Sequence, residues 1–281
     1  MKAIICSIIK NEEKNLNSFF KILDKIIDTF DDYFIILIES DSTDRTYENA
    51  KKLLSNYKGV VTKIKTDHLR LRTERISLCR NTYLQFIKKD KNLSNYNYMI
   101  VADADKVNSN ITKISILNSI KTVPQNWVGI FANQKYLYYD LWPLRIDNHI
   151  ENDCYQDFIK LSETNSTRKA YFSVIFKKFF LIKKFQDRFI EVKSAFGGFG
   201  IYKLKEVLDI EYDSSSGIYS EHVLFNKKIL EKNTNKSFYI DKKLINFSGI
   251  NEHFMKGIIY STSNFFSKKL LEKFKIINKK N

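Results

Sequence analysis

With 281 residues, the chain is long enough to bury the core of one large domain or of two smaller ones. Its 47 basic and 32 acidic residues give a net charge of +15, which favours an anionic partner: a phosphorylated substrate, a nucleic acid or an acidic membrane surface. No stretch approaches the roughly 18 uninterrupted apolar residues of a membrane span, and the first apolar run is too short for a secretion signal. The three cysteines lie far apart in the sequence, so we expect buried thiols in a cytoplasmic protein.

Strand and helix patterns alternate over the first part of the chain. Strands are expected at residues 3–9, 33–38, 60–64 and 98–102, and helices at 11–28, 44–57 and 74–87. The strands are continuous apolar runs, which is typical of strands covered on both faces. Repeated β-α units predict right-handed crossovers, and hence an α/β fold with a Rossmann-like, doubly wound and mostly parallel sheet.

After about residue 110 the pattern changes. A strand is expected at 126–133, an aromatic and loop-rich section at 136–145, and a helix that opens at Ser220. Basic and aromatic residues alternate over 168–190, and the section after Ile258 is amphipathic and rich in lysine. We find no internal repeat and no linker rich in Pro, Gly or Ser, so one domain followed by a basic tail is the simplest division.

Two aspartates follow the strand at 98–102, and they are the most informative residues of the chain. Asp103 and Asp105 are spaced i, i+2, so in an extended segment their side chains lie on the same face. At the carboxyl end of a sheet strand they would point into the crevice where open α/β sheets bind ligands. Their oxygens suit a divalent cation that carries a diphosphate. The competing interpretation is a polar turn after a buried strand.

Three motifs in order give the chain a resemblance to a known group of enzymes. Residues 8–16 read Ile-Ile-Lys-Asn-Glu-Glu-Lys-Asn-Leu, residues 39–46 read Glu-Ser-Asp-Ser-Thr-Asp-Arg-Thr, and the Asp-x-Asp pair follows. Together they resemble the GT-A fold nucleotide-sugar glycosyltransferases, in particular those like glycosyltransferase family 2. Gly197-Gly198, Glu221-His222 and His253 extend the resemblance to about residue 255. A fainter likeness to fungal capsule-associated mannosyltransferases lies in Arg75 to Arg80-Asn81 and in the motif at 139–145, Tyr-Asp-Leu-Trp-Pro-Leu-Arg.

The resemblance implies a catalytic domain over residues 1–255, with a nucleotide-binding half at 1–110 and an acceptor half at 111–255, before a basic tail at 256–281. It implies that Asp103 and Asp105 hold Mn²⁺ or Mg²⁺, with His253 as a third ligand. A histidine ligand would favour Mn²⁺, because imidazole is a softer donor than carboxylate.

The nucleotide-sugar donor is assigned to side chains from three segments. Glu39 and Asp41 would accept hydrogen bonds from the ribose and the base, whereas the competing interpretation makes them part of a helix-capping cluster in which Asp44 is the cap. Arg80 would bind the diphosphate, unless it is an ordinary surface charge. Asp103 would reach the donor through the cation.

Glu221 is the candidate general base, because a displacement that inverts the sugar needs a carboxylate near the acceptor hydroxyl. The family pattern often has Glu-Asp at this point, whereas this chain has Glu221-His222. The competing interpretations are a glutamate favoured by the helix dipole, or one that only orients the acceptor of a retaining enzyme.

The acceptor is expected to be a glycan or a lipid-linked saccharide. Candidate acceptor residues are Trp142, Arg145, Gly197 and Gly198, with core packing as the alternative for the aromatic loop. The basic segments at 168–190 and after Ile258 are candidates for peripheral contact with an anionic membrane, and a solvated basic face is the alternative.

Two other functions compete with a glycosyltransferase. A nucleotidyltransferase would need a Gly-rich loop after the first strand, and residues 9–13 contain no glycine. A nucleic-acid-binding protein would account for the charge, but no recognised binding module occurs in the sequence. We therefore expect no nucleic-acid partner.

Overall fold

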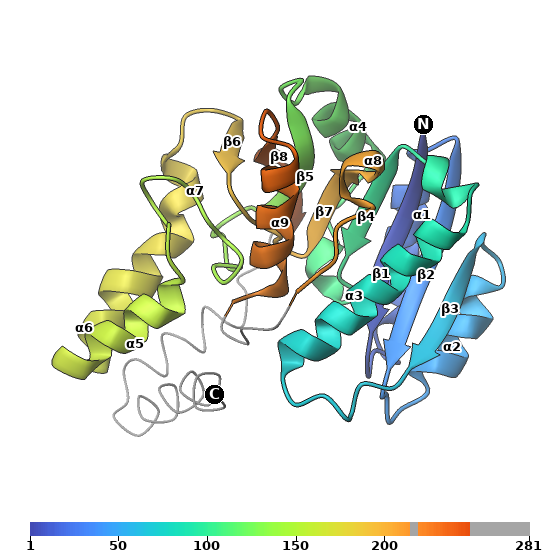
Figure 1. Ribbon diagram of the computed structural model, residues 1–281, viewed down its shortest axis with the longest axis horizontal. Coiled ribbons are helices and arrows are strands. Elements are labelled where there is room, and N and C mark those ends of the chain that lie inside the picture. Colours follow the sequence, from blue (N-terminus) through green and yellow to red (C-terminus); the bar gives the residue numbers. More distant parts are fainter. Residues whose placement is uncertain (214–218, 248–281) are drawn as a thin grey trace.

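The computed structural model describes residues 1–213 and 219–247. Within them, one eight-stranded sheet has the order β3-β2-β1-β4-β7-β5-β8-β6 (Figure 1). The strands are β1 (Lys2–Ile9), β2 (Asp32–Ser40), β3 (Gly59–Ile64), β4 (Tyr98–Ala102), β5 (Trp127–Gln134), β6 (Phe189–Val192), β7 (Phe199–Lys203) and β8 (Ser237–Phe247). The predicted α/β class and mostly parallel sheet are confirmed, because only β6 and β7 run against the other strands.

Helices cover both faces of the sheet (Figure 1). They are α1 (Leu16–Ile27), α2 (Thr46–Leu54), α3 (Arg72–Lys89), η1 (Leu93–Asn95), η2 (Lys106–Asn108), α4 (Lys113–Thr122), α5 (Cys154–Thr164), α6 (Thr167–Ala170), η3 (Tyr171–Ile175), η4 (Phe176–Phe180), α7 (Leu181–Lys184), α8 (Leu204–Val207) and α9 (Glu221–Lys232). Helices α1, α2 and α4 contribute to one buried cluster, whereas α3, α5 and α9 contribute to the other. Strand β1 alternates between the clusters, with Ile4 and Cys6 in one and Ala3 and Ile5 in the other.

The predicted helices occur with shifted boundaries that local hydrogen bonds explain. Helix α2 begins at Thr46, where the Asp44 carboxylate accepts a hydrogen bond from Thr46 N at 3.0 Å. Asp44 thus satisfies a free N–H of the first turn, but the expected cap position is taken by Arg45, whose side chain makes no capping hydrogen bond. Helix α3 begins at Arg72, before the expected start, because the Glu74 side chain accepts a hydrogen bond from Leu71 N at 2.8 Å.

Strand β7 is the feature of the fold that positions the site. It lies antiparallel between β4 and β5, and it pairs Phe199 with Ala102 at the end of β4. The next residue continues the contact, since Asp103 N donates to Gly198 O at 2.9 Å. A segment some 95 residues along the chain, Gly197-Gly198, therefore lies beside the aspartate that follows β4.

The basic and aromatic stretch at 168–190 is largely helical, and it lies with α5 at one end of the molecule (Figure 1). No helix in the described ranges combines the length and the apolar character needed to cross a membrane.

Candidate active site

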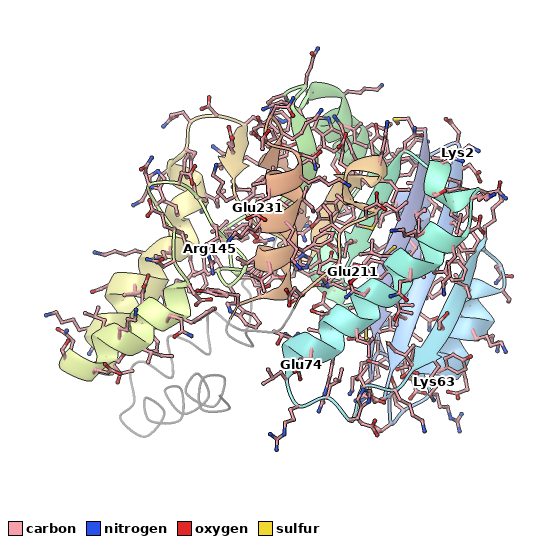
Figure 2. The ribbon with its side chains drawn as sticks, viewed as in Figure 1. Lys2, Lys63, Glu74, Arg145, Glu211 and Glu231 are labelled. Atoms are coloured by element: carbon pink, nitrogen blue, oxygen red, sulfur yellow. The ribbon has the colours of Figure 1, made fainter. Side chains whose placement is uncertain are left out.

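Parallel strands β1, β2 and β4 end at one edge of the sheet, and the loops that follow them form the site. Figure 2 shows Lys63 and Glu74 at this edge. The loops after β1 and β2 are joined there, because Asn11 Oδ1 accepts a hydrogen bond from Thr43 N at 2.8 Å. Asn11 has φ of 55°, a left-handed conformation that asparagine tolerates better than most residues.

Asp103 and Asp105 stand at the end of β4, in the expected place. Asp105 is exposed, and its carboxylate accepts a hydrogen bond from Val107 N at 2.9 Å at the start of η2. Asp103 keeps some contact with solvent, yet protein atoms surround it so closely that burial raises its pKa to about 8. The negative charge of Asp105 raises the pKa further, and the positive charge of Arg80 opposes the rise.

Two glycines let the backbone of this segment approach Asp103 and its neighbours closely. Gly197 and Gly198 have φ of 68° and 86°, which glycine adopts at little cost. A Cβ on Gly198 would lie 2.6 Å from Val107 Cγ1 and 3.5 Å from Asp103 Oδ2. The Asn108 side chain fixes this arrangement by donating to Asp103 O at 3.0 Å and to Gly198 O at 2.9 Å.

Asp140 belongs to this cluster, although the sequence analysis did not select it. Its carboxylate accepts a hydrogen bond from Gly197 N at 2.8 Å. Burial is the main cause that raises the pKa of Asp140 to about 6; the Glu221 charge adds to the rise, and Arg72 opposes it. Asp140 belongs to the motif at 139–145, but only Trp142 and Arg145 of that motif were expected to bind the acceptor.

Glu221 and Arg80 form a buried ion pair. Arg80 Nε lies 3.3 Å from Glu221 Oε1, and the two residues are only 5% and 4% exposed. His222 Nε2 lies 3.7 Å from the same oxygen. The sequence analysis assigned Arg80 to the donor and Glu221 to the acceptor, so the structure brings together two residues that were expected to serve different substrates.

Glu39 and Asp41 differ in how far their oxygens are already occupied. Glu39 is fully buried at the end of β2, and its Oε1 accepts a hydrogen bond from Ser42 N at 2.7 Å. Within the described ranges its Oε2 has no hydrogen-bond partner, and Lys63 Nζ lies 3.9 Å away. The Asp41 carboxylate accepts from both Thr66 Oγ1 and Thr66 N, and these bonds lower the pKa of Asp41. Glu39 thus retains an acceptor for a ligand.

Trp142 and Arg145 lie on the loop that leads from β5 to α5. Trp142 is half-buried, whereas Arg145 is buried and pairs with Asp153 at 3.4 Å (Figure 2). The Arg145 guanidinium also donates to Trp142 O at 2.9 Å and to Leu144 O at 2.8 Å. Arg145 therefore shapes its own loop.

A cavity of about 370 Å³ lies between this loop and α9. Its lining residues are Arg145, Ile146, Asp147, Ile150, Glu151, Lys193, Tyr219, Val223, Leu224 and Lys227. Two of its lining residues, Tyr219 and Val223, are each two positions from Glu221 in the sequence.

Among the described residues, no three His, Cys, Asp or Glu side chains lie together in a group able to hold a metal ion. Asp103 and Asp105 alone would leave a cation to complete its coordination with other oxygen donors, such as a diphosphate and water. His253, the expected third ligand, and the basic tail at 256–281 lie outside the described residues.

No protein-family model and no curated protein matches the sequence. Among solved structures, TarS residues 1–349 from S. aureus in complex with UDP is 12% identical, with a TM-score of 0.50 over 98% of this chain and 70% of that chain. The chain has a GT-A fold.

Two other solved structures are similar to the chain at TM-scores below 0.5. Mannosyltransferase PcManGT from Pyrobaculum calidifontis, in complex with GDP-Man and Mn²⁺, is 10% identical, with a TM-score of 0.49 over 99% of this chain and 70% of that chain. Glucosyl-3-phosphoglycerate synthase from Mycobacterium tuberculosis, in complex with Mn²⁺, UDP and phosphoglyceric acid, is 8% identical, with a TM-score of 0.47 over 93% of this chain and 77% of that chain. At such identities the likeness concerns the GT-A fold and not the substrates.

Proposed function

We propose that the protein is a metal-dependent glycosyltransferase that moves a sugar from a nucleoside diphosphate donor to a hydroxyl of a glycan or lipid-linked acceptor. The observation that carries the proposal is the position of Asp103 and Asp105, at the end of β4 and beside the close backbone approach at Gly198. The fold is shared with TarS, whose structure holds UDP, and this supports a nucleotide donor.

The residues at the end of β4 fit a divalent cation, Mn²⁺ or Mg²⁺. The pKa of Asp103 is raised to about 8 because carboxylates crowd a buried region, and a bound cation would supply the missing positive charge. Asp103 and Asp105 would hold the ion. When bound, it would neutralise the charge that develops on the leaving diphosphate.

Donor contacts are proposed for two of the remaining groups at this edge. Glu39 Oε2, which lacks a hydrogen-bond partner among the described residues, would accept from a ribose hydroxyl, while Asp41 holds its own loop through Thr66. Arg72 is exposed at the start of α3 and lowers the pKa of Asp140, so it lies close enough to the cluster to face a diphosphate.

Glu221 would act on the acceptor. The acceptor oxygen forms a bond to the anomeric carbon, the bond from that carbon to the diphosphate oxygen breaks with its electron pair leaving on the diphosphate, and the hydroxyl proton passes to the Glu221 carboxylate. Glu221 is near enough to raise the pKa of both Asp103 and Asp140, and this proximity supports its proposed role.

The cavity beside α9 is proposed as the passage for the acceptor glycan, because its lining residues Tyr219 and Val223 flank Glu221 in the sequence and because it presents the Tyr219 ring. Replacing Tyr219 by Ala should raise the KM for the acceptor and leave donor hydrolysis unchanged. Equal KM values for the variant and the parent protein would exclude this passage.

A thermal-shift screen tests the function. UDP, GDP, CDP and dTDP sugars are compared with and without Mn²⁺, because a ligand that binds the native state raises its melting temperature. We expect one base to give a shift that depends on Mn²⁺, and a variant with Asp103→Asn and Asp105→Asn to lose both the shift and donor turnover. Asp209→Asn, an exposed carboxylate 2.9 Å from Lys88, is the matched control and should behave like the parent. If no nucleotide sugar shifts the parent protein, the proposal fails.

Peripheral membrane contact is proposed for the helical segment after α5. Residues 168–190 contain seven Lys or Arg and one acidic residue, Asp187, and five of the seven are exposed: Arg168, Lys169, Lys177, Lys183 and Lys184. Such a segment is attracted to anionic headgroups. Co-sedimentation with anionic vesicles, but not with neutral ones, is expected, and equal recovery with both would contradict the contact.

A further inference from the structure

The Glu221 carboxylate is held by nitrogen atoms from two elements. Arg80 of α3 places Nε 3.3 Å from Glu221 Oε1, and His222 of α9 places Nε2 3.7 Å from the same atom. All three residues are at most 5% exposed. Both nitrogens thus contact Oε1, whereas the other carboxylate oxygen, Oε2, lies 3.5 Å from the Ser220 hydroxyl.

Arg80 is fixed by groups that have no part in binding a diphosphate. Its guanidinium carbon lies 5.1 Å from the centre of the Phe196 ring and 5.4 Å from that of Tyr212, on both of which a guanidinium stacks favourably. The neighbouring Asn81 holds Tyr212 in place, since its side chain donates to Tyr212 O at 2.9 Å and accepts from Tyr212 N at 2.8 Å. The adjacent pair Arg80-Asn81 thus organises one pocket around Glu221.

His222 is also fixed, but its polar atoms are not used. Its ring stacks on Phe196 at 4.0 Å with an angle of 20° between the planes, and the edge of Tyr212 meets it at 5.7 Å. Within the described ranges neither ring nitrogen has a hydrogen-bond partner. Burial lowers the pKa of His222 well below its usual range, so the ring is neutral and one nitrogen carries a proton to donate. A small movement of Glu221 would bring its oxygen into hydrogen-bond distance of Nε2.

We propose that Arg80 and His222 are positioning residues that aim the Glu221 carboxylate at the acceptor hydroxyl, and that Arg80 therefore serves the acceptor side of the reaction instead of binding the donor diphosphate. This rests on the proposed function, because it gives Glu221 the role of base. It assigns a task to the histidine that stands where related sequences often have an aspartate. It also explains why an arginine buried beside the site makes its closest ionic contact with Glu221.

A double-mutant cycle separates this task from a merely structural one. The variants are Arg80→Gln, Glu221→Gln and both together, assayed by release of nucleoside diphosphate from the donor that the screen identifies. If Arg80 acts through Glu221, each single variant should lose about 100-fold in kcat, and the double variant should lose no more than Glu221→Gln alone. Losses that multiply in the double variant would overturn the proposal.

Donor binding is measured on the same variants, with UDP and GDP as probes, each with Mn²⁺. The dissociation constant should stay within about 3-fold of the parent in Arg80→Gln, because the proposal places no diphosphate contact on Arg80. Weakening by 10-fold or more with additive kinetics would return Arg80 to the donor. Arg80→Lys keeps the charge and should restore part of kcat, which also serves if Arg80→Gln folds poorly.

His222 is tested by two substitutions that differ in one property. His222→Gln keeps an N–H donor and should retain kcat within about 3-fold, whereas His222→Phe keeps the stacking on Phe196 and should lose about 10-fold without a change in donor KM. Equal activities of the two variants would remove His222 from the proposal. Arg188→Lys is the control, since it alters an ion pair with a different buried carboxylate, Asp241, and it should change the melting temperature but not kcat.

If the donor screen finds no ligand, the proposed function has failed and the cycle has no substrate. If a donor binds and turns over while the cycle is additive, only the positioning proposal has failed. The two failures are therefore distinguishable.

Discussion

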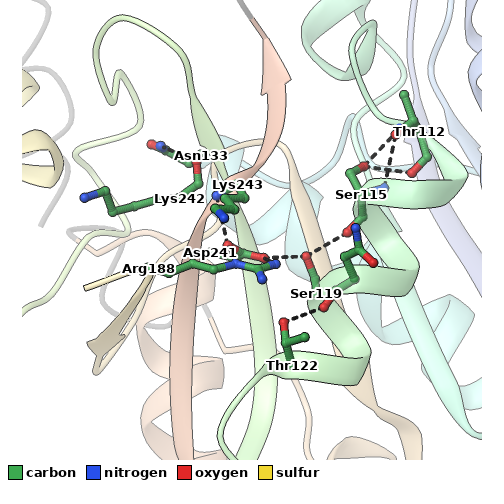
Figure 3. A network of polar contacts seen from close by, with 10 residues as sticks. Thr112, Ser115, Ser119, Thr122, Asn133, Arg188, Asp241, Lys242 and Lys243 are labelled. Carbon is green, nitrogen blue, oxygen red and sulfur yellow. Dashed lines mark hydrogen bonds and ion pairs between the residues drawn. The ribbon is translucent and has the colours of Figure 1, made fainter. Parts of the chain in front are cut away.

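Two arginine–carboxylate ion pairs with a buried carboxylate, Arg188–Asp241 and Arg80–Glu221, differ in how completely they are hydrogen-bonded. In the first, Arg188 donates to Asp241 through Nε at 2.9 Å and Nη2 at 2.7 Å, a two-point contact (Figure 3). The same carboxylate accepts from Ser119 Oγ at 2.6 Å and from Lys243 N at 2.9 Å. Asp241 thus joins β8, α4 and the residue before β6, and both of its oxygens are used.

The second pair, Arg80 and Glu221, is incomplete. Its one contact at 3.3 Å is not aligned as a hydrogen bond, and within the described ranges Arg80 Nε has no hydrogen-bond partner. The same holds nearby for both nitrogens of His222 and for the hydroxyls of Tyr138 and Tyr202. A saturated buried network stabilises one arrangement, whereas unsatisfied buried groups are costly and persist where a ligand or a movement completes them. The difference indicates that Asp241 serves the fold and Glu221 serves the reaction.

Asp241→Asn should give the largest loss of stability. The amide nitrogen cannot accept a hydrogen bond, so the Arg188 charge loses its partner and Ser119 or Lys243 loses an acceptor. We expect the free energy of unfolding to fall by about 3 kcal/mol, within the range for breaking a buried ion pair. Urea unfolding at pH 7 measures this change. The turnover of the folded fraction should be unchanged, and a large loss of kcat would break the contrast between the pairs.

Glu221→Gln should have a small effect on stability and a large effect on turnover. The contact that is lost is 3.3 Å long and not aligned as a hydrogen bond, and the guanidinium stays stacked on Phe196 and Tyr212, so we expect the free energy of unfolding to fall by only about 1 kcal/mol. The rate should fall by about 100-fold, which is typical for the loss of a general base. Unfolding and turnover are measured on one preparation. A loss of 3 kcal/mol with normal turnover would make this pair structural, like the first.

The first half of the fold was predictable because its signals are local. Strands β1 to β4 are continuous apolar runs, and α1 to α3 repeat apolar residues at helical spacing, so sequence alone places Asp103 at a strand end. Strand β7 has no such signal. It has five residues, starts after two glycines, and obtains its place from pairing with β4 and β5, which lie far away in the sequence.

The candidate site was predictable to the same extent. The Asp-x-Asp pair is visible because it follows a strand, whereas Asp140 becomes relevant only when β7 brings Gly197 to its carboxylate. The partner of Arg80 depends on α9 packing against α3, a contact between residues 141 positions apart that no local pattern encodes. His222 looked like a departure from a family pattern, and only its stacking on Phe196 shows how it is held.

Asp32 extends the comparison to a carboxylate that is well bonded but close to solvent, and it should give the smallest effect. Its oxygens accept from Lys58 Nζ at 2.7 Å and Tyr96 Oη at 2.8 Å, and these bonds hold its pKa well below the usual range. A lowered pKa in the folded state means that the stabilisation is present above the unfolded-state pKa of roughly 4 and is lost as the pH falls below it. Because the side chain is 22% exposed and the Lys58 side chain is 66% exposed, solvent screening limits the expected contribution to about 0.5–1 kcal/mol.

Urea unfolding of the parent protein and of Asp32→Asn at pH 7 and at pH 2.5 measures this contribution. The variant should be less stable at pH 7. The difference in the free energy of unfolding should narrow at pH 2.5, because the Asp32 carboxylate of the unfolded parent takes up a proton there while Lys58 and Tyr96 still hold the folded one ionised, which favours unfolding. If the difference in the free energy of unfolding is the same at both pH values, Lys58 and Tyr96 recognise the shape of the side chain and not its charge. If Asp32→Asn lowers the free energy of unfolding as much as Asp241→Asn does, burial of the carboxylate does not determine how much such a network stabilises this fold.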